Sequence, residues 1–217
     1  MRTLLLLLLT LPLGACNIVA PAALLIHGPE KVPPIHTLEP ARPTVVVVDV
    51  APGLPLRPAV RTAIARQAGQ ELLDSRAVTT VIDPRAAESI VSLDRLGTPM
   101  PLSEIGRAAS AEVVLHVLVE SFSITSDNQS LAPRAALRVK VIDATNEARL
   151  FPPPSDGRAG YPIALARPLR TTALPSRGTE WNQAELEFAE WVGVAVGQAF
   201  HEHERLESHL VTRGSPN

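Results

Sequence analysis

The residues best suited to acid–base or metal chemistry in this 217-residue chain are histidines with carboxylates nearby. His116 stands in a run that alternates like a strand, and Glu120 follows on the same side of that strand. The segment 201–204 reads His-Glu-His-Glu, but side chains two positions apart on a helix point about 200° apart, so these histidines cannot share one metal ion from one helical face. We expect His116 to be a partly buried strand residue and 201–204 to be a solvated helical end. No catalytic residue and no metal site is predicted.

Asp49 lies near the end of the β-branched run Thr44–Val50, a pattern typical of a strand buried on both faces. A nucleotide-binding turn after such a strand needs glycines at two or three set positions, so that backbone N–H groups approach the phosphates. Here only Gly53 is present, and Pro52 has no N–H to donate. A phosphatase-type site would need a second aspartate where Ala51 stands. We therefore expect no cofactor, and interpret Asp49 as a polar residue at the end of a strand.

Residues 1–15 are predicted to be a signal peptide, and the only cysteine, Cys16, follows it. Arg2 supplies a positive charge, and the apolar run 3–12 is too short for the roughly twenty residues of a membrane-spanning helix. The segment Leu13-Gly14-Ala15-Cys16 resembles the lipobox of bacterial lipoproteins, in which the cysteine is lipidated and becomes the new N-terminus. The resemblance implies that Cys16 is the membrane anchor and that Leu13, Gly14 and Ala15 are recognised by the signal peptidase. An ordinary secretory signal with a chance cysteine is the alternative.

The lipobox also implies a location. A lipidated Cys16 would hold the protein in the cell envelope, facing the periplasm. In the lipoprotein pattern an aspartate just after the cysteine often marks retention in the inner membrane, and here that position is Asn17, which favours the outer membrane. The net charge of −2, without a basic stripe, gives no reason to expect a nucleic-acid partner.

Proline clusters divide the chain. The prolines of 28–43 indicate a semi-rigid tether, so that residues 16–43 form a lipidated cysteine followed by a proline-rich spacer. Residues 44–207 are predicted to form one α/β domain, in which 152–178 is an irregular loop insertion. Residues 208–217 are expected to be a disordered tail.

Hydrophobic periodicity predicts the elements of this domain. Strands are expected at 44–50, 78–82, 113–124, 135–143 and 149–151, and helices at 56–74, 84–91, 104–110 (capped by Ser103) and 181–207. This order predicts a single α/β domain of two or three layers, with a mixed sheet and a long C-terminal helix.

The passage from the third helix into the next strand, Glu104 to Leu115 (EIGRAASAEVVL), resembles that of the envelope lipoproteins of the CsgG/LpoB/TolB-N-terminal-like group. Two features depart from that group. Ser110-Ala111-Glu112 replaces its commoner Gly-Ala-Asp, and 152–178 lacks the alternation of a pore-forming hairpin. The resemblance implies a non-enzymatic envelope role through binding a partner protein.

Three hypotheses of function follow. The first is a lipid-anchored, non-enzymatic adaptor or regulator that binds a periplasmic protein. The second is a subunit of an envelope assembly or export-related complex, which includes a homo-oligomer. The third is an envelope hydrolase that uses His116 and nearby carboxylates.

Overall fold

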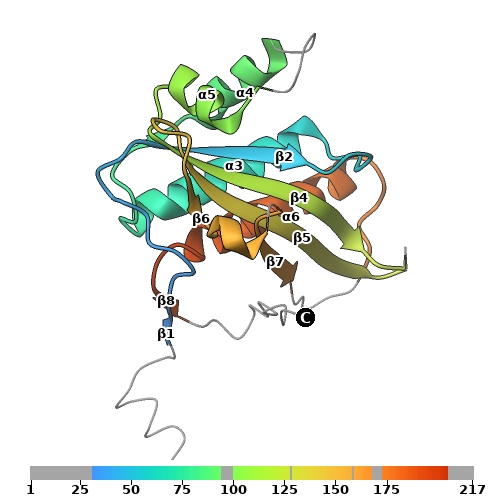
Figure 1. Cartoon of the computed structure of the whole chain (residues 1–217). Coiled ribbons are helices and arrows are strands. Elements are labelled where there is room, and N and C mark those ends of the chain that lie inside the picture. Colours follow the sequence, from blue (N-terminus) through green and yellow to red (C-terminus); the bar gives the residue numbers. More distant parts are fainter. Residues whose placement is uncertain (1–30, 94–99, 128, 158, 168–172, 205–217) are drawn as a thin grey trace, which may run out of the picture.

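The computed structural model describes residues 31–93, 100–127, 129–157, 159–167 and 173–204 (Figure 1). Its elements are β1 (Lys31–Val32), β2 (Thr44–Val50), α3 (Pro58–Asp74), β3 (Val81–Ile82), α4 (Pro84–Leu93), α5 (Leu102–Ala108), β4 (Val113–Thr125), β5 (Leu131–Asp143), β6 (Arg149–Phe151), the short 3₁₀ turn η2 (Pro154–Asp156), β7 (Tyr161–Ala166), α6 (Thr179–Gln198) and β8 (His203–Glu204). None of the described helices is long and apolar enough to cross a bilayer.

A six-stranded mixed sheet forms the centre of the domain, in the order β3-β2-β4-β5-β6 with β7 also paired to β5. The β-branched strand β2 runs parallel to both β3 and β4, as its apolar sequence predicts for an interior strand. The pairs of β5 with β4, β6 and β7 are antiparallel. The prediction of a mixed α/β sheet with a C-terminal helix is confirmed.

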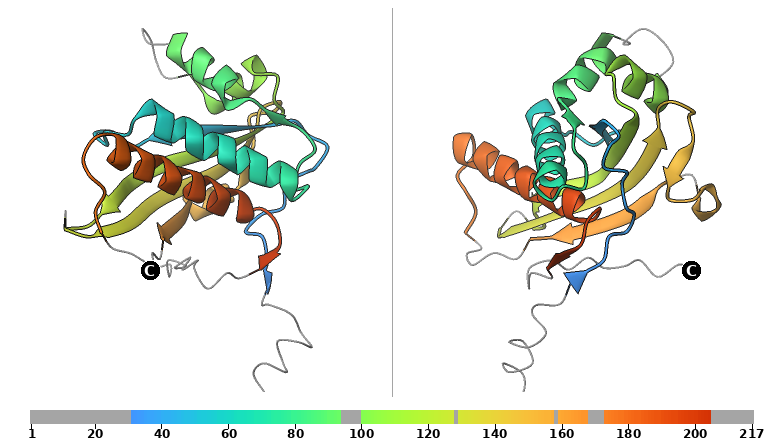
Figure 2. Two further views of the ribbon diagram at one scale, coloured as in Figure 1. Left: turned by 180° about the vertical axis from the view of Figure 1, so that it is seen from behind. Right: turned by 90° about the vertical axis from the view of Figure 1, so that its left-hand side faces the viewer.

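The two faces of the sheet are covered unequally (Figure 2). Helices α3 and α6 lie across one face and bury the main core, which includes Leu115, Val117 and Phe188. On the other face, α4 and α5 cover only the beginnings of β2 and β4, over a smaller cluster that includes Val45 and Val114. The domain therefore has three layers at one end of the sheet and two at the other.

Helices α3 and α6 approach closely because α6 presents glycine to α3. A Cβ atom at Gly193 would lie 2.7 Å from the carbonyl oxygen of Ile64, and one at Gly197 would lie 3.0 Å from that of Ala68. Real Cβ atoms do not approach other atoms to 2.7 Å, so any side chain at Gly193 would force the helices apart. The spacing of four residues keeps both glycines on one face of α6.

Residues 31–43 differ from the tether that the prolines predict. The strand β1 pairs with β8, and the Ile35 N–H donates to the Ala199 carbonyl at 2.8 Å. Leu38 is buried in the main core, with 4% of its surface exposed. The extended backbone that proline favours lies along the domain here, because apolar side chains between the prolines are buried against it. The tether prediction for residues 16–30 lies outside the described residues.

Two further segments differ from their predicted structure. Helix α6 ends at Gln198, well before 207, and the chain then turns into β8. The segment 152–178 contains a strand, β7, that pairs with β5 along its whole length. The alternation of buried Ile163 and Leu165 with exposed Pro162 and Ala164 is that of an edge strand, which tolerates proline. Other boundaries shift by a few residues: β3 is limited to Val81–Ile82, and Ser103 lies inside α5, whose N-cap is Pro101.

Candidate functional site

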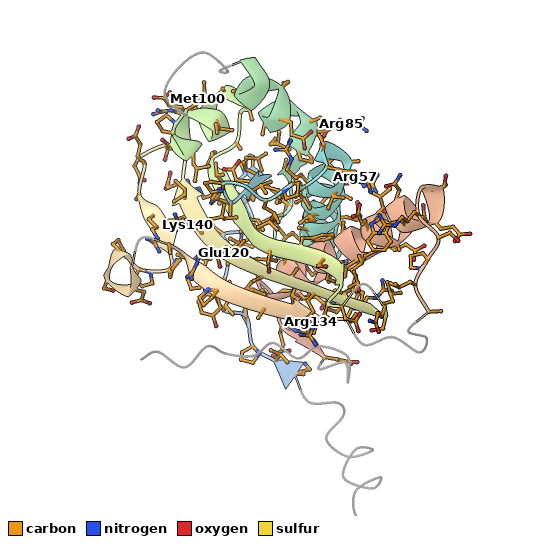
Figure 3. The ribbon with its side chains drawn as sticks, turned by 90° about the vertical axis from the view of Figure 1, so that its right-hand side faces the viewer. Arg57, Arg85, Met100, Glu120, Arg134 and Lys140 are labelled. Carbon is orange, nitrogen blue, oxygen red and sulfur yellow. The ribbon has the colours of Figure 1, made fainter. Side chains whose placement is uncertain are left out.

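One part of the sheet, which we name the open face, is covered by none of the described α-helices (Figure 1). It faces away from α3 and α6 and lies beyond α4 and α5. Its side chains come from three neighbouring strands: Leu118 and Glu120 of β4, Arg134, Ala136, Arg138 and Lys140 of β5, and Pro162, Ala164 and Ala166 of β7. His116 of β4 lies on the same side of the sheet but is buried. Figure 3 shows Glu120, Arg134 and Lys140 along these strands.

Positive charge exceeds negative charge on the open face. Glu120 is neutralised by Arg138, whose Nε lies 2.6 Å from its Oε1. Lys140 has no carboxylate within ion-pair distance among the described residues, and neither has Arg149, which lies near it on β6. Partial burial, and then repulsion from Arg149, lower the pKa of Lys140 from its usual value. The two cations therefore remain uncompensated side by side.

Arg149 is also incompletely hydrogen-bonded. Its Nη1 donates to the Gly157 carbonyl at 2.7 Å, whereas Nε and Nη2 are buried with no hydrogen-bond partner in the described part of the chain. Buried donors left unpaired cost free energy. This region would gain stability from an anionic group that compensated Lys140 and Arg149 together.

His116 pairs with Asp49 of β2, not with Glu120 of its own strand. Its Nε2 lies 2.8 Å from Asp49 Oδ2, and this hydrogen bond lowers the pKa of the aspartate although burial opposes the shift. The parallel register places Val47 opposite His116, so Asp49 lies two residues farther along the same side of β2. The sequence pattern missed the pair because its members are 67 residues apart and meet only through the pairing of β2 with β4.

The His116–Asp49 pair is a link between strands. The imidazole is 7% exposed, and its Nδ1 is buried without a hydrogen-bond partner among the described residues. Nε2 is already engaged by Asp49, so neither ring nitrogen is turned toward solvent. Asp49, by contrast, is partly exposed, and it lines a groove on its other side.

This groove, which we name the β2 groove, lies between β2, α3 and α4 and has a volume of about 540 Å³. Its lining comprises Val46, Val47, Val48 and Asp49 of β2, Pro58, Arg61 and Ala65 of α3, and Pro84, Arg85, Ala87, Glu88 and Ser89 of α4. The volume is within the range of small-molecule pockets. Figure 3 shows Arg85 on α4 and Lys140 on β5, at opposite sides of the view.

The histidines of 201–204 do not form a solvated helical end, and that prediction is wrong. His201 follows the end of α6, and its Nε2 lies 3.0 Å from Glu71 Oε1 of α3. His203 belongs to β8, where it pairs with Val32. Within the described ranges no three His, Cys, Asp or Glu side chains are grouped as a metal ion would require.

The lipobox lies outside the described residues, so Leu13, Gly14, Ala15 and Cys16 have no structural account. Their assignment as recognition residues and lipid anchor stays a prediction.

Comparison with known proteins gives likeness of fold only. No protein-family model matches the chain, and no curated protein matches it. Among solved structures it is similar to the PelC dodecamer from Paraburkholderia phytofirmans, at 15% identity over 80% of this chain and 97% of that chain, with a TM-score of 0.40. A hypothetical protein from Chlamydia trachomatis matches at 15% identity over 74% and 98%, with a TM-score of 0.40. Lipoprotein GNA1162 from Neisseria meningitidis matches at 11% identity over 70% and 96%, with a TM-score of 0.39. Likenesses this distant assign neither a family nor a function.

Proposed function

We propose that this protein is a lipid-anchored component of the bacterial cell envelope that acts as a non-enzymatic adaptor or regulator. In this proposal Cys16 carries the lipid, the domain faces the periplasm, and the open face binds a partner protein. The lipobox-like segment supports the location. The single observation that carries the binding role is the open face, the part of the sheet that none of the described α-helices covers, with Gly160 packed against Arg138 and Lys140 at one end.

The charge of the open face supports a partner surface that is acidic. Lys140 and Arg149 are uncompensated, whereas Glu120 is already paired with Arg138. Small residues of β7, among them Ala164, leave room for another surface to approach the strands. A protein surface bearing carboxylates would therefore be complementary in both charge and shape.

The test is site-specific photocrosslinking in growing cells with the full-length protein. A photoreactive residue at Ala164 samples the open face, and the same residue at Gln70, exposed on α3, samples the opposite side as a matched control. We expect one discrete adduct from Ala164 and none from Gln70. The adduct should be lost in the charge-reversed variant Lys140→Glu and kept in Arg66→Glu, which changes an exposed arginine of α3.

Other outcomes would overturn the proposal. Equal adducts from Ala164 and Gln70, or an adduct insensitive to Lys140→Glu, would show that the open face is not the binding surface. An adduct with the mass of two copies of this chain would favour the alternative, a subunit of an envelope assembly.

A further inference from the structure

The β2 strand has an unpaired edge that opens into the β2 groove. On one side β2 pairs with β4 along its whole length, from Thr44↔Val113 to Val50↔Val119. On the other side β3 pairs only with Thr44 and Val45. In the described part of the chain, no strand therefore lies beside Val46–Val50 on that side.

The hydrogen-bonding direction along β2 shows which groups face this edge. The Thr44 N–H donates to Thr80 on the β3 side, and the Ala51 N–H donates to Val119 on the β4 side. Backbone groups of a parallel strand point alternately to its two neighbours. Val48 therefore directs its N–H and its C=O at the open edge, whereas Val47 directs its own at β4.

The groove beside this edge has room for an extended segment. Its walls are α3 and α4, and the stretch Val46–Asp49 forms the strand side. Four residues in β conformation extend about 13 Å, at roughly 3.3 Å each. A peptide strand of that length would continue the sheet where β3 stops, with α4 beside it.

The charged groups around the groove favour an acidic segment. Arg61 of α3 lines the groove, and its Nε is buried without a hydrogen-bond partner among the described residues. No described carboxylate lies within ion-pair distance of it, although its charge contributes to the lowered pKa of Asp49. The other charges are Arg85, Glu88, which accepts a hydrogen bond from Thr62, and Asp49, which is engaged by His116. A carboxylate entering the groove would meet Arg61 and Arg85, while both resident carboxylates already have partners.

We propose that the β2 groove binds an extended peptide segment of a partner protein, which adds a strand to the edge of β2 and pairs an acidic side chain with Arg61. Main-chain hydrogen bonds to Val48 would supply affinity, and Arg61 would supply specificity. This inference goes beyond the proposed function, because it assigns a second binding surface and names how a partner segment would be held there. It uses a surface different from the open face.

The test begins with a phage-displayed library of random heptapeptides, panned on the full-length protein in detergent. We expect enrichment of peptides that carry Asp or Glu. Their affinity should fall about ten- to a hundredfold in Arg61→Met, the loss expected for one charged hydrogen bond. Arg61→Lys should retain most of the binding, and Arg66→Met, on the same helix outside this groove, should match the wild type. Thermal melting checks that each variant is folded.

Backbone amide exchange then identifies the binding mode. An enriched peptide should slow exchange of the Val48 amide at least about tenfold and leave that of Val47, already bonded to β4, nearly unchanged. The inference would be overturned if panning on the wild type enriched no acidic peptides beyond those enriched on Arg61→Met. It would also be overturned if the bound peptide left the exchange rate of the Val48 amide unchanged. Concentration-dependent protection of Val48 without peptide would assign the edge to a second copy of this chain. If the β2 groove binds no peptide but the Ala164 crosslink persists, the proposed function stands and only this inference is overturned. If the groove binds peptide but the Ala164 crosslink is absent, only the assignment of the open face is refuted.

Discussion

Arg42 and Asp143 form the most enclosed ion pair among the described residues. Arg42 Nη2 lies 2.9 Å from Asp143 Oδ1, and the two side chains are 17% and 8% exposed. Arg42 also bonds to the side chain and carbonyl of Glu112. The pair joins the segment before β2 to the end of β5, so one arginine connects the N-terminal part of the chain to a strand that lies two positions from β2 in the sheet.

Asp143→Asn should destabilise the protein by about 1.5–3 kcal/mol at neutral pH, since it weakens a buried charge-assisted hydrogen bond. The bond to Arg42 holds the pKa of Asp143 well below 3.8, its usual value. The stabilisation is therefore fully present above about pH 4 and is lost as the pH falls toward the folded-state pKa.

Urea unfolding from pH 3 to 7 measures this effect. The difference between wild type and Asp143→Asn should be constant near neutrality and shrink below about pH 4. The exposed Asp74→Asn is the control, with little change expected at neutral pH. A difference that grew on acidification would contradict the assigned direction.

At the scale of elements, the α3–α6 contact depends on the absence of side chains. Gly197→Ala should destabilise the domain by about 1–3 kcal/mol, because its Cβ would lie 2.6 Å from the Cβ of Glu71. In a helix, alanine is more favourable than glycine by up to about 1 kcal/mol, so helix propensity alone would make Gly197→Ala stabilising. A measured loss of stability would therefore come from the packing against α3. Asn182→Ala, on the exposed side of α6, should change the free energy of unfolding little. Stabilisation by Gly197→Ala would show that the helices can separate without cost.

The sequence pattern predicts elements with strong periodicity and fails where distant segments decide the structure. The alternation of β4 and β5 and the apolar run of β2 identify the central strands. The sequence pattern does not reveal the strand β7, because Pro162 indicates a strand breaker unless the strand is known to lie at an edge. Glu120 lies at a bulge, since the register with β5 shifts between Val119 and Ser121. No local pattern reveals that shift, or the Asp49–His116 pair.

For the whole molecule, Leu38 tests whether the N-terminal segment belongs to the domain. Leu38→Ala should lower the free energy of unfolding by about 2–5 kcal/mol, the range for emptying a buried leucine site. Glu39→Ala, exposed beside it, is the control and should have little effect. A change for Leu38→Ala as small as that of the control would mean that this segment is a tether after all.

Lipid attachment is tested at Cys16. Labelled palmitate should be incorporated into the wild-type protein, and the protein should fractionate with membranes. Cys16→Ser should abolish both labelling and membrane association, because the acyl chains provide the anchoring free energy. Labelling that survives Cys16→Ser would place the lipid elsewhere and remove the basis of the proposed location.

The pairing of β1 with β8 has a mechanical consequence for an anchored protein. Lys31 lies opposite Glu204, so the chain before β1 and the chain after β8 leave the pair at the same end. A load applied through the N-terminus would open this pair from that end, one contact after another, and next break the Ile35–Ala199 hydrogen bond. The packing of Ile35 on the core and the stacking of His36 on Phe151 resist next, and Leu38 is the first fully buried side chain that the load reaches. The seven residues released before it have a contour length of roughly 25 Å, at about 3.5 Å each, which is an upper bound on the length added to the connection of an anchored protein while the sheet stays intact.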